Sequence, residues 1–263
     1  MAISAFSESV AWITGASAGI GRALAIELGK VGARVAVSAR RTERLTEVAG
    51  AVDAAGGRAL VIPCDVTDER AVEGAVAEIA DRVGRLDLAV ANAGFSVGGR
   101  FSSLTADDWR RQLDTNVVGA AVTIRHALPE LEKTGGRALL VGSVAGMIPA
   151  PKAAPYAASK AAVRAMGQAL SAELAGRGVS VTTVHPGFVE SEIAHVDNRG
   201  RFDPDRVDRR PLRWPADRAA RSILRAAARR KREHVFTAHG RLAGYLGRHA
   251  PALTHLAVTR GRR

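Results

Sequence analysis

Short apolar runs alternate along the chain with longer segments whose apolar residues recur at helical spacing. Each run is about five or six residues long, and they cover 10–14, 34–38, 59–63, 86–91, 137–142, 180–185 and 234–238. Several are rich in valine, and they are continuous rather than alternating with polar residues. This pattern is typical of strands that are buried on both faces of a parallel sheet.

The segments between these runs predict helices. Residues 19–31 place their apolar side chains on one face of a helix. The segments 42–55 and 68–83 follow the same pattern, and we expect Thr67 to cap the second of them. The repeated order of strand and helix predicts an α/β fold, a doubly wound Rossmann sheet with helices on both faces. No repeat or linker divides the sequence, so residues 1–263 are expected to form a single domain.

Length and composition fit this picture. The chain has 263 residues, of which 47% are hydrophobic, and this is enough for one large domain with a buried core. Its single cysteine, Cys64, cannot form an internal disulfide, so we expect a buried thiol in a reducing compartment. No apolar stretch approaches the roughly 20 residues that span a bilayer, and the first apolar run leads into a glycine-rich turn rather than a signal peptide. A cytoplasmic location is therefore expected.

The turn after the first strand predicts a dinucleotide site. It reads TGASAGIG and begins at residue 14. Gly15 permits a tight turn, Gly19 lets a pyrophosphate approach the backbone, and Gly21 lets the next helix pack closely on the sheet. Ser17 and Ile20 are expected to contact the dinucleotide as well, beside the free N–H groups at the start of the helix. The glycines alone are a weak signal, but their position between a strand and a helix strengthens it.

The end of the second strand indicates which dinucleotide binds. It carries no acidic residue that could accept hydrogen bonds from a ribose 2′-OH. Ser38, Arg40 and Arg41 can instead bind a 2′-phosphate, Arg40 through a forked, charge-assisted contact. We therefore favour NADP(H) over NAD(H) as the cofactor. The alternative is that the two arginines are solvated residues at the start of a helix.

Two further strand ends contribute to the predicted cofactor site. A short polar side chain after the third strand could hold the adenine amine, and an Asn-Ala-Gly turn after the fourth would pass under the cofactor. The predicted contacts are Asp65, Val66, Asn92, Ala93 and Gly94. Aspartate and Asn-Ala-Gly also occur in ordinary turns, which is the alternative interpretation of both segments.

Four polar residues are candidates for catalysis. Tyr156 and Lys160 lie four residues apart, on one face of a predicted helix. A tyrosine with a pKa near about 10 is a poor acid or base at neutral pH, and a neighbouring ammonium lowers that pKa. Ser143 ends the fifth strand, where it can hydrogen-bond a substrate oxygen. Asn116 lies within a predicted helix, where asparagine is disfavoured, which suggests a polar task such as holding a water behind Lys160.

With these motifs the sequence resembles the short-chain dehydrogenase/reductase family. The resemblance covers about residues 10–192 and includes the glycine-rich turn, the Asn-Ala-Gly and Pro-Gly turns and the four polar residues. It implies a seven-stranded parallel sheet, a nicotinamide cofactor and a catalytic tetrad of Asn116, Ser143, Tyr156 and Lys160. It also implies a homodimer or homotetramer built through the helices that carry Asn116 and Tyr156.

The resemblance extends to further cofactor contacts. It implies contacts at Pro186, Gly187 and Val189 after the sixth strand, and it assigns Arg40 to the 2′-phosphate. Many members of the family have a threonine after the Pro-Gly turn, and here Ser191 is its expected substitute.

The segments expected to line a substrate pocket are apolar. They offer Phe95, Val97, Met147, Ile148, Pro149, Phe188 and Ile193 as candidate contacts. Few charges lie among them, so we expect a hydrophobic ketone or alcohol rather than a sugar or an acid. The alternative is that several of these side chains only pack in the core. No metal site is predicted.

The basic charge of the chain is concentrated near its end. Residues 1–198 contain 20 basic and 21 acidic residues, whereas residues 199–263 contain 18 and 5. We expect a substrate loop or lid and a helix over about 190–232, the helix running from 215 to about 229, and a basic tail over about 240–263. The segment 242–258 could rest on an anionic membrane surface; a solvated tail or an arm that covers a dimer interface is the alternative. The tail lacks interleaved aromatic residues, which disfavours nucleic-acid binding.

The sequence thus predicts an NADP(H)-dependent oxidoreductase that interconverts a carbonyl and an alcohol. Tyr156 would exchange a proton with the substrate oxygen, and carbonyl reduction is the favoured direction. The alternative is a non-catalytic dinucleotide sensor or interaction protein on the same fold.

Overall fold

The computed structural model describes residues 2–203 and 213–250, together with positions 205, 208, 252, 254, 256 and 259. Within this part of the chain, seven strands form one sheet in the order β3-β2-β1-β4-β5-β6-β7, and every neighbouring pair is parallel. The strands are β1 Val10–Thr14, β2 Arg34–Ser38, β3 Arg58–Val61, β4 Leu88–Ala91, β5 Arg137–Val141, β6 Ser180–Val184 and β7 Glu233–His234. The strand order reverses between β1 and β4, and open parallel sheets bind ligands at such a point.

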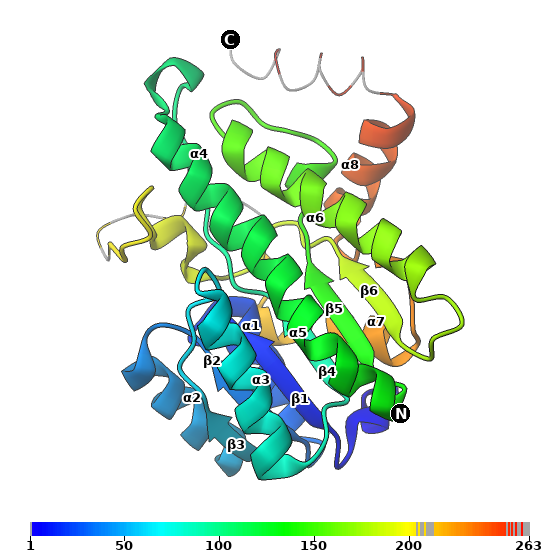
Figure 1. Cartoon of the computed structure of the whole chain (residues 1–263). Coiled ribbons are helices and arrows are strands. Elements are labelled where there is room, and N and C mark those ends of the chain that lie inside the picture. Colours follow the sequence, from blue (N-terminus) through cyan, green and yellow to red (C-terminus); the bar gives the residue numbers. More distant parts are fainter. Residues whose placement is uncertain are drawn as a thin grey trace.

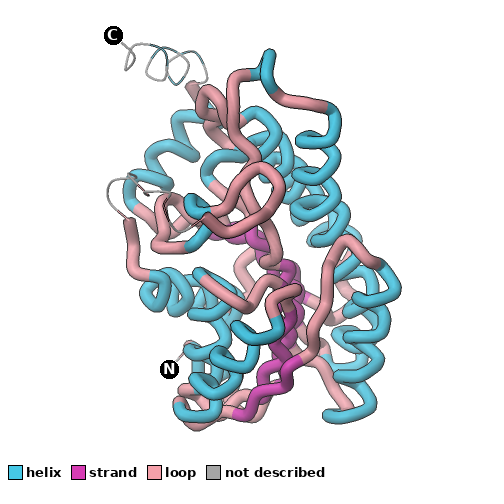
Figure 2. The backbone as a smooth tube through the Cα atoms, turned by 90° about the vertical axis from the view of Figure 1, so that its left-hand side faces the viewer, coloured by secondary structure: helices cyan, strands magenta, loops and turns pink. Residues whose placement is uncertain are grey.

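Helices cover both faces of the sheet (Figures 1 and 2). They are α1 Gly19–Gly29, α2 Thr42–Ala54, α3 Glu69–Val83, α4 Ala106–Leu113, α5 Gly119–Thr134, α6 Ala154–Glu173, α7 Ala216–Ala228 and α8 Ala238–His249. One hydrophobic core lies between the sheet and α1, α2 and α7, and the other lies between the sheet and α3, α5 and α6. Successive residues of β1 enter the two cores alternately, because side chains of a strand point to opposite faces in turn: Ile13 belongs to the first and Trp12 to the second.

The observed elements confirm most of the predicted ones, with two corrections. The predicted strand over 234–238 is wrong beyond its first residue, because Thr237 caps α8 by accepting a hydrogen bond from the backbone N–H of Gly240. Thr67 does not cap α3; the carboxylate of Asp68 does so, by accepting from two backbone N–H groups of the first turn. The helix predicted from 215 is confirmed as α7, with Pro215 at its N-cap.

The predicted amphipathic tail is described only in part. Its first portion lies in α8, which begins at Ala238 and lies beyond the carboxyl ends of the strands (Figure 1). Leu242 and Tyr245 on α8 are 62% and 64% exposed. Most positions after 250 are outside the described residues, as are Pro204 and Pro211 in the expected lid. Among the described residues, no helix has the length and apolar character needed to cross a bilayer.

Candidate active site

A cavity of about 530 Å³ opens where the strand order reverses. Its wall includes the glycine-rich turn, the ends of β2, β4 and β5, the start of α6, and the segment that follows β6. The predicted site residues among its lining are Gly15, Ser17, Gly19, Ile20, Arg40, Arg41, Asp65, Val66, Asn92, Ala93, Gly94, Phe95, Ser143, Tyr156, Lys160, Pro186, Gly187 and Val189. Residues separated by more than a hundred positions in the sequence thus meet around one cavity.

The glycine-rich turn is as tightly packed as the sequence predicts. Gly15 has a φ of +65°, and a Cβ on it would lie 2.6 Å from the Cα of Ala93. A Cβ on Gly21 would lie 2.4 Å from the carbonyl oxygen of Gly15. The side-chain amide of Asn92 donates to the carbonyl of Gly15 at 3.1 Å and fastens β4 to the turn. Ala18, the N-cap of α1, has no side chain that could accept from the first-turn N–H groups, so these donors are left for a ligand.

The two arginines after β2 lie in different surroundings. Arg40 is 63% exposed at its side chain, and its Nη1 lies 3.9 Å from Oδ2 of Asp65. Arg41 reaches back over the glycine-rich turn, where its Nη2 donates to Oγ of Ser17 at 3.1 Å and to Oε2 of Glu192 at 2.8 Å. Arg41 does lie at the start of α2 with a side chain that is 39% exposed, but it is more than a solvated residue, because its guanidinium joins two segments of the cavity wall.

Ser38 does not fit its predicted role as a phosphate ligand. Its side chain is fully buried, and its Oγ accepts a hydrogen bond of 2.9 Å from the indole Nε1 of Trp12. The Ser38 side chain points toward Trp12 in the core and not into the cavity. Of the residues predicted to bind the 2′-phosphate, only Arg40 and Arg41 therefore line the cavity.

Lys160 and Tyr156 occupy the first two turns of α6, as expected. The Nζ of Lys160 donates to the carbonyl of Val141 at 2.7 Å and lies 5.9 Å from the centre of the Tyr156 ring. Burial disfavours the ammonium and lowers the pKa of Lys160 to about 8.

Ser143 lies two residues beyond β5. Its Oγ caps a short 3₁₀ turn, Val144–Gly146, by accepting a hydrogen bond from the N–H of Ala145.

Asn116 lies in a π-helical turn, Asp114–Val118, that joins α4 to α5. Single π turns within helices occur often at functional sites. Its side chain is buried and exchanges two hydrogen bonds of 3.1 Å with the backbone of Phe95, and its Nδ2 also lies 3.1 Å from Oγ of Ser159. Asn116 therefore ties the loop after β4 to α6, while the predicted water behind Lys160 stays a prediction.

The substrate side differs from the prediction. Phe95 and Ile193 line the cavity as predicted, but the other predicted contacts do not. Met147 and Ile148 lie beneath α8, where a Cβ on Gly247 would meet the Met147 carbonyl at 2.6 Å. Phe188 is 39% exposed and does not line the cavity. The apolar side chains that join Phe95 there come from the segment after β6 and are Ile193, Val196 and Phe202.

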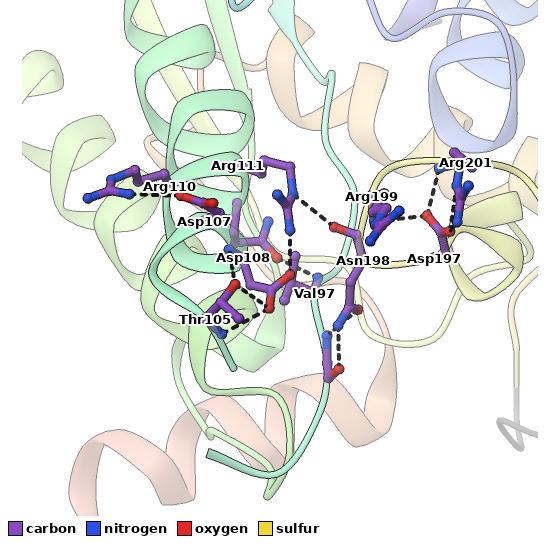
Figure 3. Close-up of polar contacts among 12 residues, drawn as sticks. Val97, Thr105, Asp107, Asp108, Arg110, Arg111, Asp197, Asn198, Arg199 and Arg201 are labelled. Carbon is purple, nitrogen blue, oxygen red and sulfur yellow. Dashed lines mark hydrogen bonds and ion pairs between the residues drawn. The ribbon is translucent and has the colours of Figure 1, made fainter. Parts of the chain in front are cut away.

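That segment ends in a short hairpin that the sequence did not predict. Val196 and Phe202 form an antiparallel bridge, and the turn between them is held by the carboxylate of Asp197. At its tip the side-chain amide of Asn198 accepts from the N–H of Gly98 at 3.0 Å and donates to its carbonyl at 2.9 Å (Figure 3). We refer to residues 195–203 as the strap.

The strap is also connected to α4. Nε of Arg111 donates to the carbonyl of Asn198 at 3.3 Å, and its Nη2 donates to Asp108 (Figure 3). Asp108 and Thr105 cap α4 reciprocally, which anchors this end of the network. No sequence motif marks Glu192, Asn198 or Arg111, since each is an ordinary polar residue with a partner far away in the chain.

Comparison with known proteins agrees with this architecture. The family model described as short chain dehydrogenase matches residues 9–201. A 3beta-hydroxysteroid dehydrogenase of Mediterraneibacter gnavus is 36% identical over 189 residues, which are 72% of this chain and 68% of that protein.

Two solved structures extend the likeness to almost the whole fold. An alcohol dehydrogenase from the archaeon Thermococcus sibiricus, complexed with 5-hydroxy-NADP, has a TM-score of 0.75 and 26% identity over 87% of this chain and 95% of its own. A short chain dehydrogenase/reductase from Burkholderia phymatum, in complex with NAD, has a TM-score of 0.85 over 94% and 95%; at 23% identity it supports the fold alone. The chain belongs to the short-chain dehydrogenase/reductase family of oxidoreductases.

Proposed function

We propose that this chain is an NADP(H)-dependent oxidoreductase that interconverts a carbonyl and an alcohol on a hydrophobic small molecule. The observation that carries the proposal is that Ser143, Tyr156 and Lys160 line the same cavity as the glycine-rich turn. A proton donor and a dinucleotide site then lie side by side, as carbonyl reduction requires.

The residues present fit a nicotinamide dinucleotide. The glycine-rich turn admits a backbone-bound pyrophosphate, and the uncapped start of α1 offers N–H donors to it. Arg40 and Arg41, with no acidic residue at the end of β2, favour a 2′-phosphate. The similar solved structures were obtained with both kinds of cofactor, 5-hydroxy-NADP in one and NAD in another, so the preference for NADP(H) rests on the arginines.

When bound, the cofactor supplies or accepts the hydride. The chain's own residues handle the proton: the Tyr156 hydroxyl donates it to the substrate oxygen during reduction and takes it back during oxidation. The charge of Lys160, held near the ring, favours the phenolate that remains after donation. The Ser143 hydroxyl hydrogen-bonds the same substrate oxygen as negative charge develops on it.

An apolar substrate fits the part of the cavity that apolar side chains line. Phe95, Ile193 and Phe202 contribute large apolar side chains to its wall. The relative from Mediterraneibacter gnavus is named for a hydroxysteroid, which is also a largely apolar alcohol. We therefore propose hydrophobic ketones as the first compounds to test, with reduction as the favoured direction.

Substitution of Tyr156 by phenylalanine tests this proposal against the alternative of a non-catalytic dinucleotide sensor. An enzyme loses turnover by about 10²- to 10⁴-fold when its proton donor is removed, yet still binds cofactor. The measurement is NADPH oxidation with a panel of apolar ketones, beside a fluorescence titration of NADPH. A wild-type protein that binds NADPH but turns over no carbonyl compound would favour the sensor.

The assembly and location are further proposals. We propose a cytoplasmic homodimer or homotetramer that uses α5 and α6, where Val118 beside α5 is 51% exposed.

Contact with an anionic membrane surface through α8 is a separate proposal, which the exposed pair Leu242 and Tyr245 beside Arg241 supports. Sedimentation with anionic and neutral vesicles would separate such contact from a solvated tail.

A further inference from the structure

The three arginines that follow β2, namely Arg40, Arg41 and Arg44, each face a carboxylate. Nη2 of Arg41 lies 2.8 Å from Oε2 of Glu192, and Nη2 of Arg44 lies 3.8 Å from the other oxygen of the same carboxylate. Arg40 faces Asp65 at 3.9 Å. A 2′-phosphate that enters here would therefore meet acidic groups as well as basic ones.

Glu192 comes from a distant part of the chain and is held in place. It opens a short 3₁₀ turn, Glu192–His195, and the preceding residue, Ser191, lies against the glycine-rich turn: a Cβ on Gly19 would be 3.0 Å from Cβ of Ser191. The side chains of Arg41 and Glu192 are 39% and 28% exposed, so water screens this pair less than it screens a fully exposed one. The packing of its own segment against the glycine-rich turn thus places the carboxylate beside Arg41.

The consequences differ for the two kinds of dinucleotide. A 2′-phosphate, which is close to doubly charged at neutral pH, needs donors of Arg41 that Glu192 already occupies, and the carboxylate repels it. A 2′-hydroxyl carries no charge and is not repelled. We propose that Glu192 is a specificity-determining residue, which lowers the affinity for NADP(H) relative to NAD(H) and so limits the preference that Arg40 and Arg41 create.

This inference rests on the proposed function, because it assumes that the cavity binds a nicotinamide dinucleotide. It concerns the ratio of two affinities, however, and not the presence of binding. The chain itself offers variants that separate charge from hydrogen bonding. Glu192→Gln removes the charge and keeps an acceptor for Arg41, whereas Glu192→Ala removes both.

A matched control lies on the same surface. Glu47 pairs with Arg44 at 3.2 Å on α2, and its side chain is 65% exposed. Glu47→Gln therefore changes the net charge of the protein by the same amount, without touching Arg41. It controls for the general attraction between a basic protein and a more negative ligand.

The experiment is fluorescence titration of full-length protein with NADPH and with NADH, for the wild type, Glu192→Gln, Glu192→Ala and Glu47→Gln. We expect Glu192→Gln to bind NADPH at least threefold more tightly, with its NADH affinity within twofold of wild type and the Glu47→Gln variant unchanged. The gain should shrink at about 0.5 M salt, where the Debye length is only a few ångströms.

Other outcomes overturn the inference. Equal changes for both dinucleotides in Glu192→Gln would mean that the residue only fastens its segment to the glycine-rich turn. Weaker NADPH binding in that variant would mean that Glu192 prepares Arg41 for the phosphate instead of competing with it. If the wild type binds neither dinucleotide, the proposed function fails and this inference fails with it, a result that is distinct from an unselective response of the variant.

Discussion

The two ends of the cavity are built by different means. At the centre of the cofactor end is one short stretch of sequence, the glycine-rich turn, which close contacts at Gly15 and Gly21 hold against the end of β4. The substrate end is assembled from Phe95, Ile193 and Phe202, which come from two distant loops. The first end depends on positions where only glycine fits, whereas the second depends on how two loops pack. We therefore expect an added methyl group to cost more at the glycine-rich turn than on a peripheral helix such as α8.

The largest effect is expected at the cofactor end. Gly21→Ala would place a Cβ 2.4 Å from the carbonyl of Gly15 and 2.6 Å from the Asn92 amide. We expect it to destabilise the fold by about 3 kcal/mol and to abolish dinucleotide binding, because the backbone on both sides must move. Urea unfolding and NADPH titration measure both quantities.

The control for this substitution is Gly74→Ala. Gly74 lies in α3 with nothing within 4 Å of the position of a Cβ, so alanine should stabilise the helix by about 0.5–1 kcal/mol. Equal effects of the two substitutions would show that glycine in the turn is not required by close packing.

The second prediction concerns the buried amine beside Tyr156. The pKa of Lys160 is lowered by burial from 10.5 to about 8, so in the folded protein the amine loses its proton at a lower pH than in the unfolded chain. Below about pH 8 it is charged in both states; between about pH 8 and 10.5 only the unfolded chain keeps the proton, and stability rises with pH. Relative to Lys160→Met, the wild type should gain about 2 kcal/mol between pH 7 and pH 10.

Urea unfolding of both proteins at pH 7, 8.5 and 10 checks this prediction. Lys133→Met is the matched control, because the side chain of Lys133 is 67% exposed on α5. Its stability relative to the wild type should hardly change over the same range. A constant difference between the wild type and Lys160→Met would mean that burial does not perturb the amine.

Outside the cavity, where α8 covers Met147 and Ile148, a comparable clash should cost less. Gly247→Ala would place a Cβ 2.6 Å from the carbonyl of Met147 and 2.7 Å from Cγ1 of Ile148. Since α8 lies at the periphery, it can shift, and we expect a loss of about 1–2 kcal/mol with unchanged NADPH affinity. Thermal unfolding and NADPH titration measure the two, with Gly50→Ala in α2 as the control, since nothing lies within 4 Å of its Cβ position. Loss of NADPH binding would contradict the expectation that the packing of α8 does not affect the cofactor end.

This contrast also explains what the sequence could predict. The strands and the glycine-rich turn follow from local patterns, so the observed bounds of β1 to β6 lie within about two residues of the predicted ones, whereas most of the predicted last strand was wrong. Ser38 was misassigned although the alternation of β2 could have excluded it, because Ser38 shares a face with Ala36, which packs in the same core as Trp12. Met147 and Ile148 were misassigned for a different reason. They are covered by α8, which lies about a hundred residues later in the sequence, and the glycines at 240, 244 and 247 are the local sign of a closely packed helix face.

The smallest effect is expected where the strap meets the loop after β4. Asn198 makes two exposed hydrogen bonds to the backbone of Gly98. Asn198→Ala should therefore weaken the contact between the strap and the loop after β4 by about 1 kcal/mol. The strap lines the cavity through Val196, Arg199, Gly200, Arg201 and Phe202, so we expect it to slow the release of a bound dinucleotide. About fivefold faster NADPH dissociation in stopped-flow fluorescence is expected, with little change in thermal stability.

The control is Asn198→Asp, whose side chain can accept from Gly98 but not donate to it. Its NADPH dissociation rate should fall between those of Asn198→Ala and the wild type. Identical dissociation rates in all three proteins would mean that the strap does not control release, and that the substrate end is held closed by packing alone.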